Sequence, residues 1–296
     1  MNTAAPIPES LASRVYRNRH FYFFISPFFI SFAILGFYPL LFSLYLAFFK
    51  WDGLTDKAFV GFGNFRTLWS DTTFWDALRN TALLGFLYVP PMLVLAFLLA
   101  VALNGPITRL RGFFRAAVFL PCVTPVVVIS IVFIIFTSRD AGLFNWLLAK
   151  IHLAPVDWRG SPLATRVTIA ILLVWRWTGY NMIFMLAGLQ GISGDVYEAA
   201  RIDGASRWQM VTRVTLPLMR STFVFCTIMS LLGTVYMFEE VLLVDLNGSA
   251  RNLGVLLFQN SFQSFKFGYA SAMAYVVAAI VFTLTMIVRR VQREEA

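Results

Sequence analysis

The chain has 296 residues, of which 59% are hydrophobic and only 13% are charged. A soluble domain is typically about 45–50% apolar and about 25% charged, so this composition excludes an ordinary soluble protein. The net charge of +9 would suggest nucleic acid in a soluble chain, but in a membrane protein it is better explained by arginines that set the orientation. Nucleic acid is therefore not an expected partner.

Cysteine and histidine are too sparse for a metal centre. Cys122 and Cys226 both lie in apolar runs, and His20 and His152 are far apart in the sequence. We expect the cysteines to be small buried hydrophobic residues, and we predict neither a disulfide framework nor a metal site.

Six apolar runs are long enough to cross a bilayer, which needs about 20 residues of helix. They lie at residues 21–49, 81–103, 116–136, 167–189, 221–244 and 268–288. The first run is too long for the core of a signal peptide, so it is interpreted as a retained span. The sequence predicts an all-α integral membrane protein with six transmembrane helices.

Arginines predict the sidedness of the spans, because cytoplasmic segments are enriched in Lys and Arg. Four segments carry them: the N-terminal tail 1–20, the second loop, the fourth loop and the C-terminal tail 289–296. The residues are Arg14, Arg17 and Arg19; Arg109, Arg111 and Arg115; Arg201, Arg207, Arg213 and Arg220; and Arg289, Arg290 and Arg293. The first, third and fifth loops mix bases with aspartates. Both termini and the fourth loop are therefore expected in the cytoplasm.

The first loop, 50–76, is expected outside the cell. Residues 50–80 place several aromatic side chains among polar ones, enough for a small helical cap against the membrane surface. These aromatics are either interfacial anchors or a docking surface for an external partner.

The fourth loop reads as two short capped helices. Asp195 with Glu198, and Ser206 with Gln209, have the spacing of capping boxes. Gly204 between them permits a tight bend. The apolar face of the hairpin is predicted from Trp208, Val211 and Val214, which have helical spacing. The hairpin is either an amphipathic element on the lipid surface or a docking element for a partner.

Three charges lie deep in the predicted spans: Arg176 near the middle of the fourth, and Glu239 and Glu240 late in the fifth. Such charges cost several kcal/mol unless they are paired or face water. They form either a structural ion pair or part of a polar path, in which the ring faces of Trp175, Tyr180 or Tyr236 would contact a solute. Our hypothesis is that Arg176 and one glutamate face a cavity together.

The chain contains no Gly-rich nucleotide-binding loop ending in Lys-Ser/Thr, and no Gly-x-Ser-x-Gly elbow. An enzyme is therefore not expected. A gradient-driven secondary transporter remains an alternative, although the chain shows no inverted repeat.

Ordered motifs carry a family resemblance. They are Phe59-Val60-Gly61, Phe74-Trp75, Asn80-Thr81, Phe119-Leu120-Pro121, Gly142-Leu143-Phe144-Asn145, Trp177-Thr178-Gly179-Tyr180-Asn181, Glu198-Ala199-Ala200, Asp203-Gly204-Ala205, Leu216-Pro217 and Gly268-Tyr269-Ala270. The set resembles the permeases of binding-protein-dependent ABC importers for carbohydrate uptake, of the maltose and glycerol-3-phosphate type. The chain departs from that pattern at Leu246–Ala250, where many relatives have Gly-Gly-Pro, and at Ser193-Gly194.

The resemblance implies a type I ABC importer permease fold, with a five-helix transmembrane domain at 77–288 and a coupling loop at about 190–217. It implies a permease subunit in the bacterial inner membrane that works with a second, related permease, a cytoplasmic ABC ATPase dimer and an external solute-binding protein. ATP and Mg would be bound by the ATPase, and no cofactor by this chain. The implied ATPase contacts are Glu198, Ala199, Ala200, Asp203, Gly204, Leu216 and Pro217.

The expected cargo is a sugar or oligosaccharide. The residues proposed for its path are Trp175, Arg176, Tyr180, Asn181, Tyr236, Glu239 and Glu240. A non-sugar solute such as glycerol-3-phosphate is the alternative, but no cluster of Arg and Lys within the spans favours a phosphate group.

Overall fold

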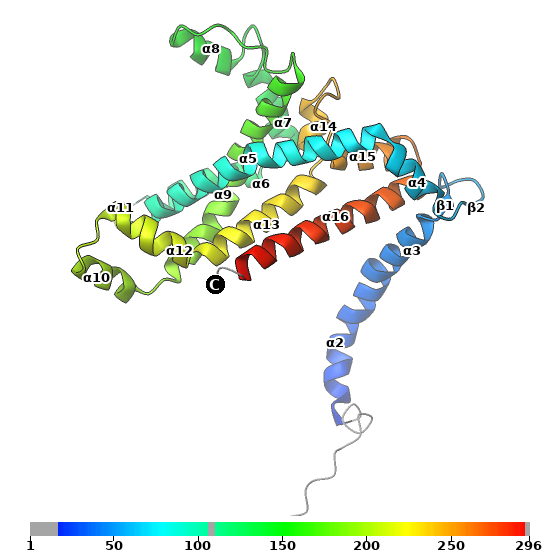
Figure 1. Ribbon diagram of the computed structural model, residues 1–296, viewed down its shortest axis with the longest axis horizontal. Helices are drawn as coiled ribbons and strands as arrows, with labels where there is room; N and C mark the ends of the chain where they lie inside the picture. The colour runs from blue at the N-terminus through cyan, green and yellow to red at the C-terminus, as the bar shows by residue number, and fades with distance from the viewer. Residues whose placement is uncertain (1–16, 106–109, 294–296) are drawn as a thin grey trace, which may run out of the picture.

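The computed structural model describes residues 17–105 and 110–293, and it is helical almost throughout (Figure 1). Four helices are long and apolar enough to span a membrane. They are the segment Arg19–Leu46, α5 (Thr72–Asn104), α9 (Pro162–Gln190) and α16 (Phe267–Arg293) over its residues Phe267–Ile287. Two bent helix pairs, Arg111–Val123 with Val126–Phe136 and Arg207–Leu218 with Arg220–Tyr236, bring the possible spans to six if each pair counts as one span. This agrees with the predicted number. Arg14 and Arg109, used for the predicted sidedness, lie outside the described residues.

The first span leaves the bundle. It consists of α2 (Arg19–Phe32), the π-helical turn η1 (Ala33–Phe37) and α3 (Tyr38–Leu46). Helix α2 has no buried residue, whereas α3 contacts α16. Figure 1 shows this blue arm pointing away from the other spans. Helix α2 therefore exposes apolar side chains around its whole circumference, whereas α3 is covered on one side by α16.

The third predicted span is bent. Helices α6 (Arg111–Val123) and α7 (Val126–Phe136) meet at 96°. Pro125 lies at the joint and holds the preceding residue, Thr124, in an extended conformation. Beyond α7, helix α8 (Leu143–Lys150) is anchored by the side chain of Asn145. Asn145 Nδ2 donates hydrogen bonds to the carbonyls of Arg139 and Val156, and Asn145 Oδ1 accepts hydrogen bonds from Val156 N and Trp158 Nε1.

The fifth predicted span, 221–244, is corrected by a break. Helix α13 (Arg220–Tyr236) ends at Met237, which is extended, and α14 (Glu239–Val244) starts anew. The Met237 carbonyl accepts a hydrogen bond from Asn252 Nδ2 at 2.7 Å, so it does not need the helical partner it would otherwise have. Helix α15 (Leu253–Phe258) and η3 (Gln259–Gln263) then lead to α16.

The first loop is only partly the helical cap that was predicted. Strands β1 (Phe49–Lys50) and β2 (Ala58–Phe59) pair antiparallel, and α4 (Gly63–Ser70) follows. Asn64 Nδ2 ties α4 to the carbonyls of Ala47 and Phe49. The loop was predicted to end at residue 76, but helix α5 already begins at Thr72. Its N-cap is Asp71, whose side chain accepts a hydrogen bond from Thr73 N.

The main core lies between α5, α9 and α13, with α14 packed against α7 and α9. Gly179 on α9 permits the closest contact with α6, since a Cβ there would lie 2.1 Å from the Val118 carbonyl oxygen. Any larger residue must push the two backbones apart.

We expect Gly179→Ala to lower the free energy of unfolding by about 1–3 kcal/mol, the usual cost of overpacking a core. The measurement is thermal unfolding of the purified chain in detergent. Gly194→Ala is the matched control, because nothing lies within 4 Å of a Cβ at that position. Equal melting temperatures for the two variants would show that the α6–α9 contact does not need glycine.

A second prediction concerns Asp71, which joins α5 to α16 by accepting a hydrogen bond from the Tyr269 hydroxyl at 2.5 Å. Partial burial raises the pKa of Asp71, but hydrogen bonds from Tyr269 and Thr73 outweigh it and hold the pKa below 3.8. The ionised carboxylate thus contributes stability that is complete above the unfolded pKa, about 4, and is lost as pH falls through the lowered pKa.

Tyr269→Phe is therefore expected to cost about 1 kcal/mol of stability at pH 7, with a smaller difference from wild type as pH falls toward 3. The measurement is chemical unfolding at a series of pH values. Tyr275→Phe is the control in the same helix: the Tyr275 hydroxyl donates to the Leu40 carbonyl, a neutral acceptor, so its effect should not change with pH. Parallel pH profiles for the two variants would contradict the assignment.

Candidate functional site

The polar hairpin between α9 and α13 forms one end of the bundle (Figure 1). It contains α10 (Gly194–Ile202), α11 (Arg207–Gln209), the π-helical segment η2 (Met210–Thr215) and α12 (Leu216–Leu218). Gly204 has φ of +78°, which confirms that the bend needs glycine. The capping box at the start of α11 is confirmed, because Gln209 N donates to Ser206 Oγ and Ser206 N to Gln209 Oε1.

The predicted capping box at Asp195 is wrong. Helix α10 begins at Gly194, and its N-cap is Ser193, two residues before the predicted cap. The Oγ atom of Ser193 accepts a hydrogen bond from Asp195 N at 3.3 Å. Asp195 lies instead in the first turn, where its negative charge favours the positive end of the helix dipole.

The hairpin holds its predicted contact residues at the surface. Helix α10 has no buried residue and packs only lightly, through contacts with η2 that include a 3.3 Å hydrogen bond between the Tyr197 and Thr215 hydroxyls. The exposed predicted contacts are Glu198, Ala199, Asp203, Gly204, Leu216 and Pro217, and Ala200 is half-buried. Their role as contacts stays a prediction.

The predicted apolar face of the hairpin is only partly formed. Val211 packs on the core, but Trp208 is 75% exposed. Ile202, which was not singled out, is 85% exposed on the other side of the Gly204 bend. The sequence signal was present, since a large aliphatic residue directly precedes Asp203-Gly204 at the expected bend. Two large apolar side chains therefore face outward at this end of the molecule.

The deep arginine has a partner. Arg176 Nη1 lies 2.5 Å from Glu240 Oε1, and the two side chains are only 12% and 6% exposed. The same guanidinium lies over the ring of Trp177, 5.2 Å from its centroid. Glu239, its neighbour, is exposed. The pair joins α9 to α14 across the break after Met237, which agrees with the structural alternative for these charges.

A cavity of about 190 Å³ lies beside Trp177, on α9, between α5 and α13. Tyr180 and Asn181 line it, as the proposed path requires. The other lining residues are Tyr88, Met92, Trp177, Met229, Ser230, Gly233 and Met237. Sequence reasoning missed these seven, because only the helix packing brings them together.

Polar atoms in the cavity wall are held in place. The Tyr88 hydroxyl lies 2.7 Å from Thr234 Oγ1 and donates to the Ser230 carbonyl. Asn181 Nδ2 donates to the Trp177 carbonyl. The wall of the cavity is thus mostly apolar and aromatic, and the Tyr88 hydroxyl and the Asn181 amide nitrogen in it are already bonded within the chain.

The other five predicted path residues do not line this cavity: Trp175, Arg176, Tyr236, Glu239 and Glu240. The hypothesis that Arg176 and one glutamate face a cavity together is therefore wrong for this cavity. Trp175 is 48% exposed and stacks on Phe133, and Tyr236 is 63% exposed at the end of α13. On a helix, Trp175 points to a different side from the cavity residues Tyr180 and Asn181. Whether either residue meets a solute elsewhere stays a prediction.

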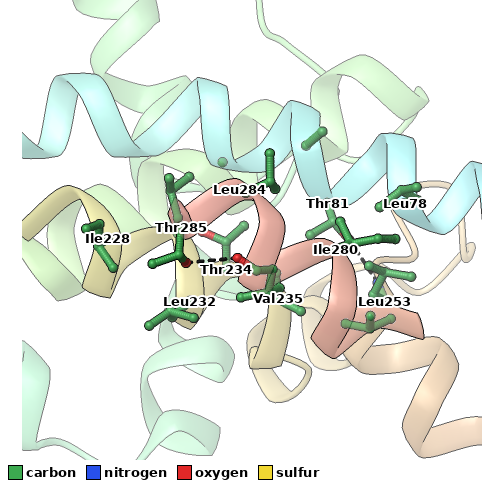
Figure 2. Close-up of a pocket in the computed structure, with 15 residues that line it drawn as sticks. Leu78, Thr81, Ile228, Leu232, Thr234, Val235, Leu253, Ile280, Leu284 and Thr285 are labelled. Carbon is green, nitrogen blue, oxygen red and sulfur yellow. Dashed lines mark hydrogen bonds between the residues drawn. The ribbon is translucent and has the colours of Figure 1, made fainter. Parts of the chain in front are cut away.

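A different, apolar pocket of about 110 Å³ lies between α5, α13 and α16 (Figure 2). Its wall is made mostly of leucine, isoleucine and valine. The three threonine hydroxyls in the wall already bond within the chain: Thr81 to Ala77 O, Thr234 to Ser230 O and Thr285 to Val281 O. This pocket therefore suits hydrocarbon and not a polar solute.

We expect Glu240→Ala to destabilise the protein by about 3–5 kcal/mol, because it leaves Arg176 buried without its partner. The double variant Arg176→Ala/Glu240→Ala should lose less than the sum of the two single variants, as shown by unfolding in detergent and a double-mutant cycle. Glu239→Ala is the control and should lie within about 0.5 kcal/mol of wild type. Additive losses would exclude a coupled pair.

Known proteins match the chain over most of its length. A family model described as "Binding-protein-dependent transport system inner membrane component" matches residues 92–293. The lactose transport system permease protein LacF of Rhizobium radiobacter is 38% identical, over 89% of this chain and 91% of LacF. The arabinooligosaccharides transport system permease protein AraP of Halalkalibacterium halodurans is 34% identical, over 90% of this chain and 85% of AraP.

The fold agrees as well. A crystal structure of a bacterial alginate ABC transporter, in complex with an alginate pentasaccharide-bound periplasmic protein, has a chain that superimposes with a TM-score of 0.83 at 25% identity, covering 97% of this chain and 98% of that one. This match confirms the type I ABC importer permease fold. The family match confirms a multi-pass inner-membrane transport subunit and not an enzyme. The chain belongs to the family of binding-protein-dependent transport system inner membrane components.

Proposed function

We propose that this chain, with a second permease, forms the path of an ATP-driven importer for a sugar or oligosaccharide. The observation that carries the proposal is the aromatic cavity beside the Arg176–Glu240 pair, where Trp177, Tyr180 and Tyr88 offer ring faces and Asn181 an amide. The relatives named for lactose and arabinooligosaccharide transport support the same class of cargo.

The hairpin receives the driving force in this proposal. An ATPase dimer would dock on α10 and the Gly204 bend, where Glu198 and Ala199 are exposed and the apolar side chains of Ile202 and Trp208 face outward. ATP and Mg would bind to that dimer, with no cofactor on this chain. This end and both termini would then lie in the cytoplasm, in accord with the arginines of the fourth loop.

The remaining partners follow from the same arrangement. The second permease would cover part of the apolar arm α2, which has no buried residue in the single chain. A solute-binding protein would deliver the sugar at the opposite end, near α4 and the β1–β2 hairpin. That a periplasmic protein is bound in the alginate transporter structure supports this last contact.

The test is uptake into proteoliposomes that contain this chain, the second permease and the ATPase, with the binding protein and a sugar panel including lactose and arabinooligosaccharides. We expect uptake of one sugar that requires both ATP and the binding protein. Uptake driven by an ion gradient alone would contradict the proposal. Uptake of glycerol-3-phosphate but of no sugar would show that the cargo is a non-sugar solute.

Two variants separate the cargo site from the coupling site. Tyr180→Ala should lower sugar uptake at least several-fold while ATP hydrolysis stays dependent on the binding protein. Trp146→Ala is the control, because Trp146 is an exposed aromatic residue on α8 that lies outside the cavity and is not among the proposed path residues. Gly204→Ala, by contrast, should reduce both uptake and hydrolysis, because alanine at φ +78° is strained by about 1–2 kcal/mol. Gly194→Ala is its control.

A further inference from the structure

A polar cavity of about 570 Å³ lies at the N-terminal end of α5, remote from the hairpin. Three arginines line it, Arg79 on α5, Arg166 in the first turns of α9 and Arg251 in the loop before α15, against one aspartate, Asp76. No carboxylate of the described chain forms an ion pair with any of these guanidinium groups. The cavity therefore carries uncompensated positive charge.

The wall of this cavity is rigidly built. Arg166 Nε donates to Asn80 Oδ1 at 3.1 Å, and its Nη2 donates to the Ser249 carbonyl at 3.2 Å. Asn80 in turn donates to the Arg251 carbonyl at 2.9 Å. The Asp245 carboxylate accepts from the amides of Ser249 and Ala250 and holds the loop in shape. The Arg166 guanidinium and the backbone of the Arg251 loop are thus positioned before any ligand binds, whereas the Arg79 side chain is exposed at the rim of the cavity.

One donor in this wall has no acceptor. Arg251 Nε is buried, and within the described residues it makes no hydrogen bond. This Nε is itself closed off from the cavity, but the Arg251 side chain is only half-buried and lines the cavity, so its other guanidinium nitrogens can donate to an oxyanion there. Arginine forms paired hydrogen bonds with planar and tetrahedral oxyanions, phosphate among them.

The depth of the cavity points to a lipid. Arg79 lies two residues before the apolar run 81–103 of α5, and Arg166 one residue before the run 167–189 of α9. Both guanidinium groups therefore lie where hydrocarbon gives way to headgroups. Free solutes reach this depth too, but phospholipid phosphates are concentrated there.

An apolar stripe continues from the cavity into the membrane. Leu83 lines the cavity and is 36% exposed, and Phe86 and Pro90 follow it on the same face of α5. Phe86 is 76% exposed. An acyl chain lying on this stripe would leave the headgroup phosphate beside Arg79.

From these observations we propose that Arg79, Arg166 and Arg251 bind the phosphate of an anionic phospholipid whose acyl chain lies along Leu83 and Phe86. The site is separate from the cargo cavity, because the two share no lining residue and Arg166 lies eleven residues before Trp177, about 16 Å along α9. It does not depend on the identity of the transported solute.

The test uses the assembled transporter, purified in mild detergent and titrated with phosphatidylglycerol, while native mass spectrometry counts the bound lipids. Wild type should retain one phosphatidylglycerol per copy of this chain, and Arg79→Gln/Arg251→Gln should bind it about tenfold more weakly. Arg139→Gln is the matched control, because Arg139 is 68% exposed and lies outside the cavity. It should bind like wild type.

Separate arms distinguish other sources of the anion. Inorganic phosphate and galacturonate should leave the bound lipid in place, and phosphatidylethanolamine should bind more weakly than phosphatidylglycerol. Displacement of the lipid by either free anion would overturn the proposal in favour of a soluble oxyanion. Equal lipid binding by the double variant and wild type would also overturn it, as would loss of the second permease from the double variant without loss of lipid.

If the double variant does not assemble, Arg79→Gln alone serves, because Arg79 is exposed and no hydrogen bond anchors it to the described chain. Weakened binding in this single variant supports the site, and unchanged binding contradicts it. Sugar uptake enters none of these measurements, so failure of the lipid site and failure of the proposed transport function are distinguishable.

Discussion

The buried ion pair between Arg176 and Glu240 is the interaction on which the rest of the site depends. In hydrocarbon, neither charge is tolerated without the other, so α14 must return to α9 after the chain leaves α13 at Met237. The helix is interrupted at Met237, and this residue lines the aromatic cavity together with Trp177 and Tyr180. One electrostatic requirement thereby couples the break in the fifth span to the proposed cargo path.

The two ends of the bundle are built on different principles. The hairpin end is local: caps at Ser193 and Ser206 and a positive φ at Gly204 shape it, and few contacts hold it to the core. Few contacts with the core would have to break for this element to shift as a unit, as the proposed ATPase docking requires. The opposite end is cross-linked by Asp71 to Tyr269 and by Asn80 to Arg251, across long stretches of sequence. These long-range hydrogen bonds make this end more rigid than the hairpin end, as the proposed lipid site requires.

Different parts of the fold were predictable to different degrees. Deep charges at Arg176, Glu239 and Glu240 were evident from hydropathy, but which glutamate pairs was not, because that depends on where α13 ends. The break is set by Asn252, fifteen residues away, whose side chain captures the Met237 carbonyl. Similarly, the N-cap of α10 was placed at Asp195 instead of Ser193. Both residues, two positions apart, offer side-chain oxygens, and only the backbone dihedral angles decide between them.

The sequence by itself determined the membrane class, the number of spans and the polar hairpin with its Gly204 bend. These properties follow from residues adjacent in the chain: the cost of placing polar groups in hydrocarbon, and hydrogen bonds that close within one helical turn. Only the tertiary structure decided the Arg176–Glu240 pair, the aromatic cavity and the three-arginine pocket. Each requires side chains from two or more helices at hydrogen-bonding distance, and the packing of helices, through contacts such as Gly179 on Val118, sets those distances.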